Sequence, residues 1–261
     1  MPVDQARSTN VCALAVMAKA PRNGEVKTRL VPPLRTEEAA ILSTCFLKDI
    51  TANFMAASES VPVAGYIAYS PPGSETLFRA LVPPEIELLA SRRIGLGHSL
   101  LDATEDLLAL GYGGACLVNS DSPTLPTSIL VDAATALQAP GDRVVLGPAL
   151  DGGYYLIGLK QPHRRLFEDI AWSTERVFHQ TVERAQSIAL DVVTLPVWYD
   201  VDDATSLGWL CREVLAGRRP TDCPRDGYAA PDTSAYLHTL VASGGGERLG
   251  VDRTLTEQMP P

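Results

Sequence analysis

VCALAVMAKAPRNGEVKTRL, residues 11–30, joins a wholly apolar run to a loop rich in cations. Residues 11–16 have the composition of a buried strand, and the Pro-Arg-Asn-Gly stretch that follows has the composition of a loop. Three of the cations, Lys19, Lys27 and Arg29, are candidate ligand-binding residues. Ligands of α/β sheets bind at the carboxyl ends of the strands, so cations at this place suit a polyphosphate. A solvated basic loop is the alternative interpretation.

The composition is that of an ordinary globular protein. The chain has 261 residues, of which 46% are hydrophobic and 20% charged, and this excludes global disorder. The net charge of −9 gives no general attraction to nucleic acid or to an anionic membrane. Positive charge for an anionic ligand must therefore be placed locally. We expect a nucleotide and a small molecule as partners, with no nucleic acid and no membrane.

Cysteine usage and the chain ends indicate a cytoplasmic protein. The five cysteines are widely spaced and form no C-x-x-C pair, which fits a reducing compartment. Residues 1–10 are polar and lack an apolar signal core. We predict a flexible N-terminus over residues 1–10, a single domain over 11–243 and a mobile glycine-rich tail over 244–261. The oligomeric state is left open.

Apolar runs alternate with helical patterns through the domain. Thr36 has the character of a helix N-cap, and apolar residues then recur every four positions as far as Phe54. Strands are expected at 11–16, 61–69, 86–90, 115–118, 144–146, 154–159 and 189–195, and further helices at 99–110, 126–137, 174–186, 203–215 and 233–241. This alternation predicts an α/β fold with three αβα layers around a mainly parallel, mixed sheet.

Asp121 directly follows the apolar run 115–118. A carboxylate at the carboxyl end of a central strand points into the ligand crevice. Carboxylates together with substrate phosphates are the usual ligands of Mg²⁺ in proteins. Asp121 is therefore a candidate metal ligand, with an aspartate that starts a turn as the alternative.

Two further motifs contain aspartates that could either contact a ligand or stabilise local structure. In Asp151-Gly152-Gly153 the glycines permit close backbone approach to a ligand, or a tight hairpin turn. In the segment 199–203, Asp200 and Asp202 lie on the same side of an extended chain. Such close carboxylates repel each other unless a cation lies between them. Asp202 or Asp203 is also expected to cap the following helix.

The segment Gly95-Leu96-Gly97-His98-Ser99 is a weaker candidate. It lacks the third glycine of a dinucleotide-binding fingerprint, so a Rossmann cofactor site is not indicated. The amides at this helix start, around Gly97 and Ser99, could still face a bound nucleotide. The chain contains neither a P-loop motif nor a G-x-S-x-G nucleophile motif.

Several of these motifs occur together in the order of a known family. The segments are Lys19-Ala20-Pro21, Gly24, Val26–Leu30, Ser120-Asp121-Ser122-Pro123, Gly147-Pro148, residues 151–159, Trp172-Ser173-Thr174 and Asp200-Val201-Asp202. From about Val11 to Val241 the chain resembles the bacterial glycosyltransferase-A-like family labelled radical-SAM/selenodomain-associated transferase. That family lies in the nucleotide-diphospho-sugar transferase superfamily. The first loop is also similar to that of the phospholactate guanylyltransferases.

The resemblance implies a GT-A-like, Rossmann-like fold and an assignment of the site. An NTP or an NDP-sugar would bind in the crevice at the first loop, with Lys19, Gly24, Lys27, Arg29, Gly97, Ser99 and Asp121 as nucleotide-binding residues. Mg²⁺ or Mn²⁺ would bind to Asp121 with Asp200 or Asp202 as a second ligand. The residues on the acceptor side would be Asp151, Gly152, Gly153 and Tyr154.

Three functions are compatible with these residues. The first is a metal-dependent nucleotidyltransferase, with Lys27, Asp121 and Asp151 as catalytic residues, which would pass an NMP from an NTP to a small phosphorylated or carboxylate acceptor. Transfer of this kind depends on positioning and charge neutralisation. The second is a GT-A glycosyltransferase with an NDP-sugar donor, for which Asp151 is the candidate base. The third is a nucleotide-binding module without turnover.

Overall fold

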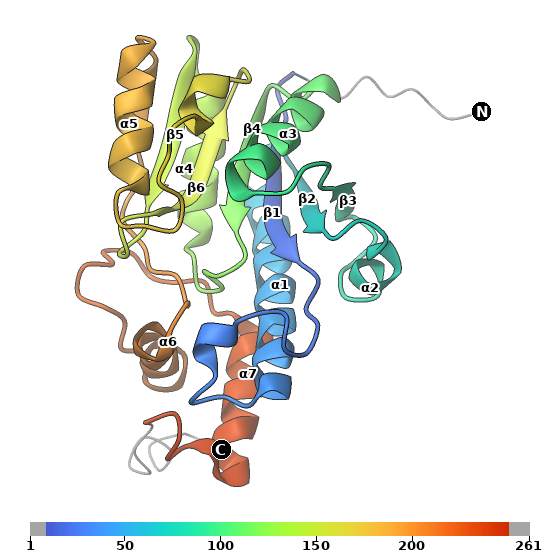
Figure 1. Ribbon diagram of the computed structural model, residues 1–261, viewed down its shortest axis with the longest axis vertical. Coiled ribbons are helices and arrows are strands. Elements are labelled where there is room, and N and C mark those ends of the chain that lie inside the picture. The colour runs from blue at the N-terminus through green and yellow to red at the C-terminus, as the bar shows by residue number, and fades with distance from the viewer. Residues whose placement is uncertain (1–8, 251–261) are drawn as a thin grey trace.

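The computed structural model describes residues 9–250, and within that range a single sheet of seven strands forms the centre of the molecule (Figure 1). The strand order is β3-β2-β1-β4-β6-β5-β7. The strands are β1 (Cys12–Lys19), β2 (Val63–Ser70), β3 (Glu87–Ala90), β4 (Gly114–Asn119), β5 (Arg143–Pro148), β6 (Tyr154–Leu159) and β7 (Asp191–Thr194).

The sheet is mixed and mostly parallel, as predicted. β1 is parallel to both β2 and β4, β2 to β3, and β5 to β7. Only β6 runs against its neighbours β4 and β5, because the turn at residues 149–153 returns the chain directly from β5 to β6.

Helices cover both faces of this sheet and complete the three predicted layers (Figure 1). One face packs against α1 (Thr36–Ser58), α4 (Thr127–Gln138), α6 (Ala204–Ala216) and α7 (Pro231–Leu240). The other face packs against α3 (Leu96–Ala109) and α5 (Val177–Ser187). The short α2 (Glu75–Arg79) lies between β2 and β3 in the chain and was not expected from the sequence. Short 3₁₀ helices cover Thr28–Leu30 and Arg164–Phe167, and a π-helical turn covers Val241–Gly245.

β1 shows why residues 11–16 are apolar without interruption. Leu14 and Val16 belong to the core on the α1 side, whereas Ala13 and Ala15 belong to the core on the α3 side. Successive side chains of a strand point to opposite faces, so a central strand that is covered on both faces must be apolar at every position.

The order of the strands creates the crevice. From β1 the chain adds β2 and β3 on one side, and then crosses to place β4 on the other side of β1. The carboxyl ends of β1 and β4 are therefore neighbours at a topological switch point, where α/β proteins bind ligands. The loop after β1 contains Lys27 and the loop after β4 contains Asp121.

Two details of the helix ends differ from the sequence-based expectations. The N-cap of α1 is Arg35 and not Thr36, which is the first helical residue. The Arg35 N–H donates to Glu38 Oε2 at 2.8 Å, so the glutamate at the third helical position supplies an acceptor for the N–H of the N-cap residue. The expected cap by Asp203 is confirmed, because its Oδ1 accepts the Ser206 N–H at 2.8 Å.

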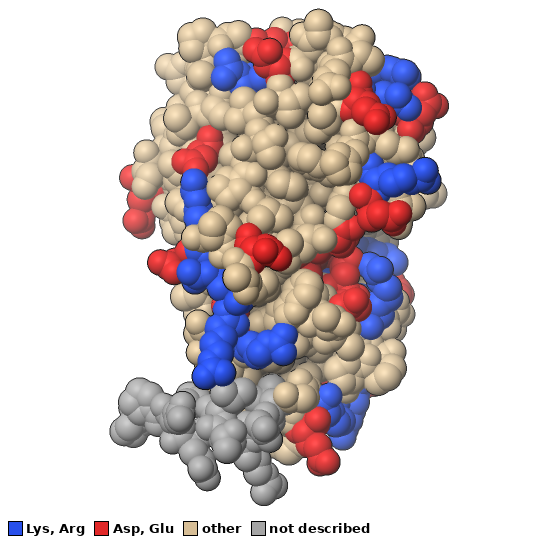
Figure 2. Space-filling view, turned by 90° about the vertical axis from the view of Figure 1, so that its left-hand side faces the viewer, with Lys and Arg blue, Asp and Glu red and all other residues tan. Residues whose placement is uncertain are grey.

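Charge is distributed in small groups over the surface. On the face that Figure 2 presents, acidic and basic side chains lie next to one another. None of the helices within residues 9–250 is both long enough and apolar enough to cross a membrane. All five cysteines are buried and free, in keeping with the sequence-based interpretation.

The predicted division of the chain at residues 10 and 243 stays a prediction. Residues 1–8 and 251–261, which include most of the N-terminal segment and of the tail, lie outside the described residues. The described part of the tail contacts the domain. Arg248 donates to the Pro33 carbonyl at 2.7 Å and to Glu38 Oε1 at 2.8 Å, and Leu249 is buried in the core on the α1 side.

α7 is fixed to α1 by a buried aspartate. Asp49 of α1 is fully buried, and its two carboxylate oxygens accept the backbone N–H groups of Asp232 at 2.9 Å and Thr233 at 2.8 Å. These are N–H groups of the first turn of α7, which have no partner inside the helix.

We predict that Asp49→Ala lowers the free energy of unfolding by about 1–3 kcal/mol, because two buried N–H groups lose their acceptors. Urea denaturation measures this change. The matched control is Asp191→Ala, which removes an exposed aspartate at the start of β7 and should change stability by less than about 0.5 kcal/mol. Equal stability of the two variants would show that the cap does not hold α7.

Candidate functional site

Two adjoining cavities open at the carboxyl ends of β1 and β4. The larger has a volume of about 470 Å³ and the smaller about 230 Å³. Arg29, Ser120, Asp121 and Asp202 line both cavities and so form the wall between them. A ligand that extends through both would therefore pass directly over these four side chains.

The smaller cavity is formed by the loop after β1. Lys19, Lys27, Thr28 and Arg29 line it, together with Ser43 of α1. The three cations found in the sequence thus meet in one place. Gly24 does not line the cavity. It adopts a φ of +76°, which glycine favours, and allows the loop to turn.

Lys27 is the most enclosed of the three cations. Its side chain is 7% exposed, and its Nζ lies 2.6 Å from Asp121 Oδ1 and 3.5 Å from Asp202 Oδ1. It also donates to the Val201 carbonyl at 2.7 Å and lies over the Phe46 ring, 5.4 Å from its centroid. The ammonium of Lys27 is therefore directed at the carboxylates and not at open solvent.

The other two cations are more accessible. The Arg29 side chain is 71% exposed, and its guanidinium bonds Asp202 Oδ2 at 2.5 Å. Lys19 is exposed, and its Nζ donates to the Glu25 carbonyl at 3.1 Å. Both side chains line the smaller cavity, so an anion bound in this cavity could contact both of them.

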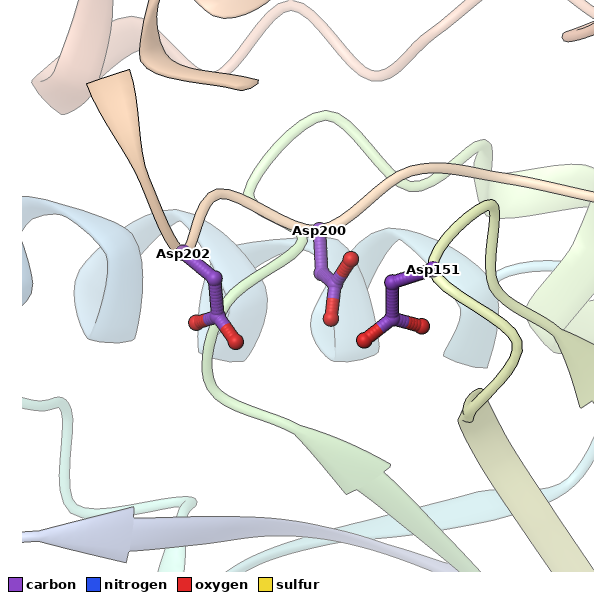
Figure 3. Close-up of side chains that lie close together, drawn as sticks. All are labelled: Asp151, Asp200 and Asp202. Atoms are coloured by element: carbon purple, nitrogen blue, oxygen red, sulfur yellow. The ribbon is translucent and has the colours of Figure 1, made fainter. Parts of the chain in front are cut away.

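Asp151, Asp200 and Asp202 form an acidic cluster at the wall of the larger cavity. One carboxylate oxygen of each lies within 4.8 Å of the others. Figure 3 shows the three carboxyl groups side by side, two from one extended segment and one from a neighbouring turn. The expectation that Asp200 and Asp202 share one side of their segment is confirmed, and Asp151 joins them.

Tight local structure positions Asp151. The Gly153 N–H donates to Asp151 Oδ1 at 2.8 Å, which closes the turn between β5 and β6. Gly152 has a φ of +88°, and a Cβ at this position would lie 2.2 Å from the Glu175 carbonyl oxygen. The first glycine is therefore required by the turn and by its contact with residue 175. Asp151, Gly153 and Tyr154 line the larger cavity, and Gly152 does not.

Asp200 and Asp202 are held by backbone contacts on both sides. The Val201 N–H donates to the Asp121 carbonyl at 2.8 Å, so the segment after β7 pairs with the loop after β4. Asp203 then begins α6 as its N-cap. This anchoring brings carboxylates that lie far apart in the sequence to one edge of the sheet.

The carboxylates of this edge differ in acidity. Burial raises the pKa of Asp200 to about 7, helped by the charges of Asp151, Asp202 and Asp121. Burial also acts to raise the pKa of Asp121, but the Lys27 ammonium outweighs it and holds this pKa below its usual range. Burial and the Asp121 charge raise the pKa of Asp202, against the opposite effect of Lys27.

The acidic cluster fits a divalent cation. Repulsion by the neighbouring carboxylates adds to the effect of burial on the pKa of Asp200, and a bound cation would relieve this repulsion. Oxygen ligands of this type suit Mg²⁺ or Mn²⁺. Asp121, predicted as the first metal ligand, is paired with Lys27, whereas Asp151, predicted on the acceptor side, lies in the cluster.

The larger cavity combines this acidic edge with apolar walls. Met17, Leu96, Leu100, Tyr154 and Trp172 line it. The rings of Tyr154 and Trp172 meet edge to face with centroids 6.5 Å apart. Trp172 was named from the sequence only as part of a motif shared with the family and was assigned no function, since a single tryptophan in a loop does not indicate which cavity it will line.

Gly97 and Ser99, predicted to bind nucleotide, line neither cavity. Gly97 lies against Trp172, and a Cβ at residue 97 would be 2.7 Å from Trp172 Cζ2. The Ser99 hydroxyl donates to the Arg93 carbonyl at 3.1 Å. Both residues lie in the first turn of α3, where Gly97 packs against Trp172 and Ser99 bonds to the preceding loop.

The chain is similar to a family model and to solved structures of other proteins. The family model DUF2064, described as an uncharacterized protein conserved in bacteria, matches residues 53–174. A crystal structure from Desulfovibrio desulfuricans G20, described as a "putative nucleotide-diphospho-sugar transferase", is 28% identical with a TM-score of 0.72, over 88% of this chain and 98% of that one. A cytidylyltransferase from Leptospira borgpetersenii serovar Hardjo-bovis gives 8% identity and a TM-score of 0.49, over 97% and 99%. No curated protein matches.

The first of these structures confirms the predicted fold, because its likeness extends over nearly the whole of both chains. The chain is an α/β protein whose mixed, mostly parallel sheet matches the nucleotide-diphospho-sugar transferase architecture. The matched segment 53–174 of the family model includes β4, Asp121 and the turn with Asp151.

We predict that Gly97→Ala displaces the Trp172 ring, since the new methyl group would meet ring atoms at 2.7–2.9 Å. Such overpacking costs about 1–3 kcal/mol, and we expect a lower melting temperature and altered tryptophan fluorescence. Gly208→Ala is the matched control, because its Cβ would meet nothing within 4 Å. An unchanged melting temperature and fluorescence in Gly97→Ala would show that Trp172 does not depend on this contact.

Proposed function

We propose that the protein is a metal-dependent nucleotidyltransferase that transfers an NMP from an NTP to a small phosphorylated or carboxylate acceptor and releases pyrophosphate. The observation that supports it most is the pair of adjoining cavities, one lined by three cations and the other by apolar side chains and an acidic edge. A nucleotide has both characters, a charged phosphate chain and a flat apolar base.

The phosphates would occupy the smaller cavity. Lys19 and the exposed Arg29 provide a point charge and a planar fork for phosphate oxygens. The chain as a whole is acidic, so these local cations matter for the attraction of an anion. The α-phosphorus would then lie over the shared wall of Ser120, Asp121 and Asp202.

The acceptor would approach from the larger cavity, past Asp151 and Tyr154. Its oxygen forms a bond with the α-phosphorus, and the bond from that phosphorus to the bridging oxygen breaks, so pyrophosphate leaves with the electron pair. A divalent cation on Asp151, Asp200 and Asp202 would neutralise charge on the phosphate oxygens. No covalent protein intermediate is required, because positioning and charge neutralisation account for this chemistry.

A second candidate is glycosyl transfer from an NDP-sugar. The description of the Desulfovibrio desulfuricans structure favours it. In this case a nucleoside diphosphate leaves from the sugar carbon, and Asp151 is the candidate base for the acceptor hydroxyl. The exposed cations of the smaller cavity favour nucleotidyl transfer, since a triphosphate carries more charge than a diphosphate ester. A nucleotide-binding module without turnover would use the same cavities.

The products distinguish these functions. We expect one NTP to bind more tightly with Mn²⁺ than any NDP-sugar, and to yield pyrophosphate when it is incubated with a metabolite extract. Calorimetry with each nucleotide, pyrophosphate detection and mass spectrometry of the products test this. Release of a nucleoside diphosphate from an NDP-sugar would establish glycosyl transfer, and binding without any product would establish the non-catalytic module.

Arg29→Ala tests the place of the phosphates. Charge-assisted hydrogen bonds contribute roughly 1.5–3 kcal/mol, so we expect about ten- to a hundredfold weaker NTP binding. Arg165→Ala is the matched control, because Arg165 pairs with Glu168 and Asp169 and lines neither cavity. If both variants bind the NTP as the wild type does, the phosphates do not contact Arg29.

A further inference from the structure

Lys27 holds a position that a metal ion would otherwise suit. Its Nζ lies between Asp121 Oδ1 at 2.6 Å and Asp202 Oδ1 at 3.5 Å, and the Val201 carbonyl lies at 2.7 Å. Three oxygens, two of them from carboxylates, thus surround one positive charge. A hard divalent cation binds oxygen atoms of the same kinds.

We infer that Lys27 is a built-in cation that occupies the place between Asp121 and Asp202, so that this edge takes a single divalent ion, on Asp151, Asp200 and Asp202. Lys27 is thereby a positioning residue for the acidic edge. Lys27 thus determines which carboxylates a divalent ion can reach. This role rests on the proposed function only in that a divalent ion binds at this edge of the sheet.

The enclosure of Lys27 supports permanent occupancy. Its side chain is 7% exposed and lies over the Phe46 ring. A buried ammonium that leaves its carboxylates loses its charge pairing, and it leaves Asp121 without a counter-charge and Asp202 with Arg29 alone, which is destabilising. By contrast Arg29, which also pairs with Asp202, is 71% exposed and can move into water.

The backbone conformation of Lys27 points to the same role. Lys27 has a φ of +50° and a ψ of +36°, in the left-handed region that non-glycine residues seldom adopt. Residues held in this region cost about 1–3 kcal/mol and persist where the surrounding contacts determine them. Here the contacts lie 174 residues away, at the Val201 carbonyl, and they explain why the loop accepts this conformation at a lysine.

The charge balance of the edge follows from this arrangement. Asp121 and Asp202 share the charge of Lys27, whereas Asp151 and Asp200 have no cation beside them in the ion pairs of residues 9–250. Figure 3 shows the Asp200 carboxyl group between those of Asp151 and Asp202, with one oxygen of each within 4.8 Å of the others. A divalent ion is therefore drawn to the Asp200 side of the cluster and not to Asp121.

The test is a titration of the full chain with Mn²⁺ in the absence of nucleotide. Electron paramagnetic resonance measures the Mn²⁺ that stays free in solution. We expect the wild type to bind one Mn²⁺. Asp200→Asn should weaken binding about tenfold or more, because a charged ligand is lost, whereas Asp121→Asn should change it by less than about threefold. If Asp121→Asn weakens binding as much as Asp200→Asn does, Mn²⁺ displaces Lys27 and the inference is wrong.

Lys27→Met gives the second arm. Removal of the ammonium opens its place, so we expect a second Mn²⁺ or about tenfold tighter binding, and a larger rise in melting temperature on addition of Mn²⁺. Lys27→Arg keeps the charge and should bind as the wild type does. Lys48→Met removes a lysine from a half-exposed pair with Asp232 and is the control for loss of charge. Unchanged binding in Lys27→Met would overturn the inference.

Failure of the proposed function would look different. If the wild type binds no Mn²⁺ but Lys27→Met does, Lys27 occupies the metal position and metal-dependent transfer on the acidic cluster is wrong. If neither the wild type nor Lys27→Met binds Mn²⁺, both claims fall. Should Lys27→Met not fold, the comparison of Asp121→Asn with Asp200→Asn still decides the inference.

Discussion

The need to neutralise crowded carboxylates at one edge of the sheet governs the candidate site. The fold brings Asp121 and Asp202 together, and the Lys27 ammonium lies between them at 2.6 and 3.5 Å. Three distant parts of the chain meet in this contact: the loop after β1, the loop after β4 and the segment after β7. Without the ammonium these carboxylates would repel each other in a partly buried place. The contact thus holds the loop after β1 in place. It also determines which carboxylates are left without a cation beside them and so can attract a positively charged ligand.

The sheet order explains why these segments meet. β1 and β4 are adjacent and parallel, so their carboxyl ends lie together, while β6 reverses direction and brings the turn with Asp151 to the same edge. β4 and β5 are both antiparallel to β6 and so run in the same direction, which puts the carboxyl end of β5 and the turn with Asp151 at this edge. Trp172 lies on Gly97 and lines the same cavity as the acidic cluster. Charged and apolar side chains therefore share one cavity.

Much of the fold could be predicted from local patterns. Apolar runs and four-residue periodicity located the strands and the long helices, because burial on one or two faces leaves a direct trace in the sequence. The hairpin turn given as an alternative for Asp151-Gly152-Gly153 is confirmed, and with it the reversal of β6. The pairing of β6 with β4 was not predicted, since pairing of strands distant in the sequence is a long-range property. α2 was missed because five residues are too few to show a helical period. The expected N-cap at Thr36 was one residue late, since Glu38 supplies the acceptor for Arg35.

The candidate site was predictable in its residue types and less so in its contacts. The two cavities are lined by cations and aspartates that were noted at strand ends, namely Lys19, Lys27, Arg29, Asp121, Asp151, Asp200 and Asp202. The pairing of Lys27 with Asp121, and the grouping of Asp151 with Asp200 and Asp202, depend on segments far apart in the sequence. The contact between Gly97 and Trp172 likewise joins residues whose neighbours give no sign of it. The segment at residues 95–99 was interpreted as a helix start whose amides could face a nucleotide, and nothing in it indicated that an aromatic ring would cover Gly97.

The most direct measurement is a crystal structure of the wild type with Mn²⁺ and a non-hydrolysable NTP analogue, with the ion located by its anomalous scattering. The account predicts a single Mn²⁺ peak between Asp151, Asp200 and Asp202, phosphates beside Lys19 and Arg29, and Lys27 still bound to Asp121. A Mn²⁺ peak between Asp121 and Asp202 with Lys27 displaced, or phosphates outside the smaller cavity, would contradict it.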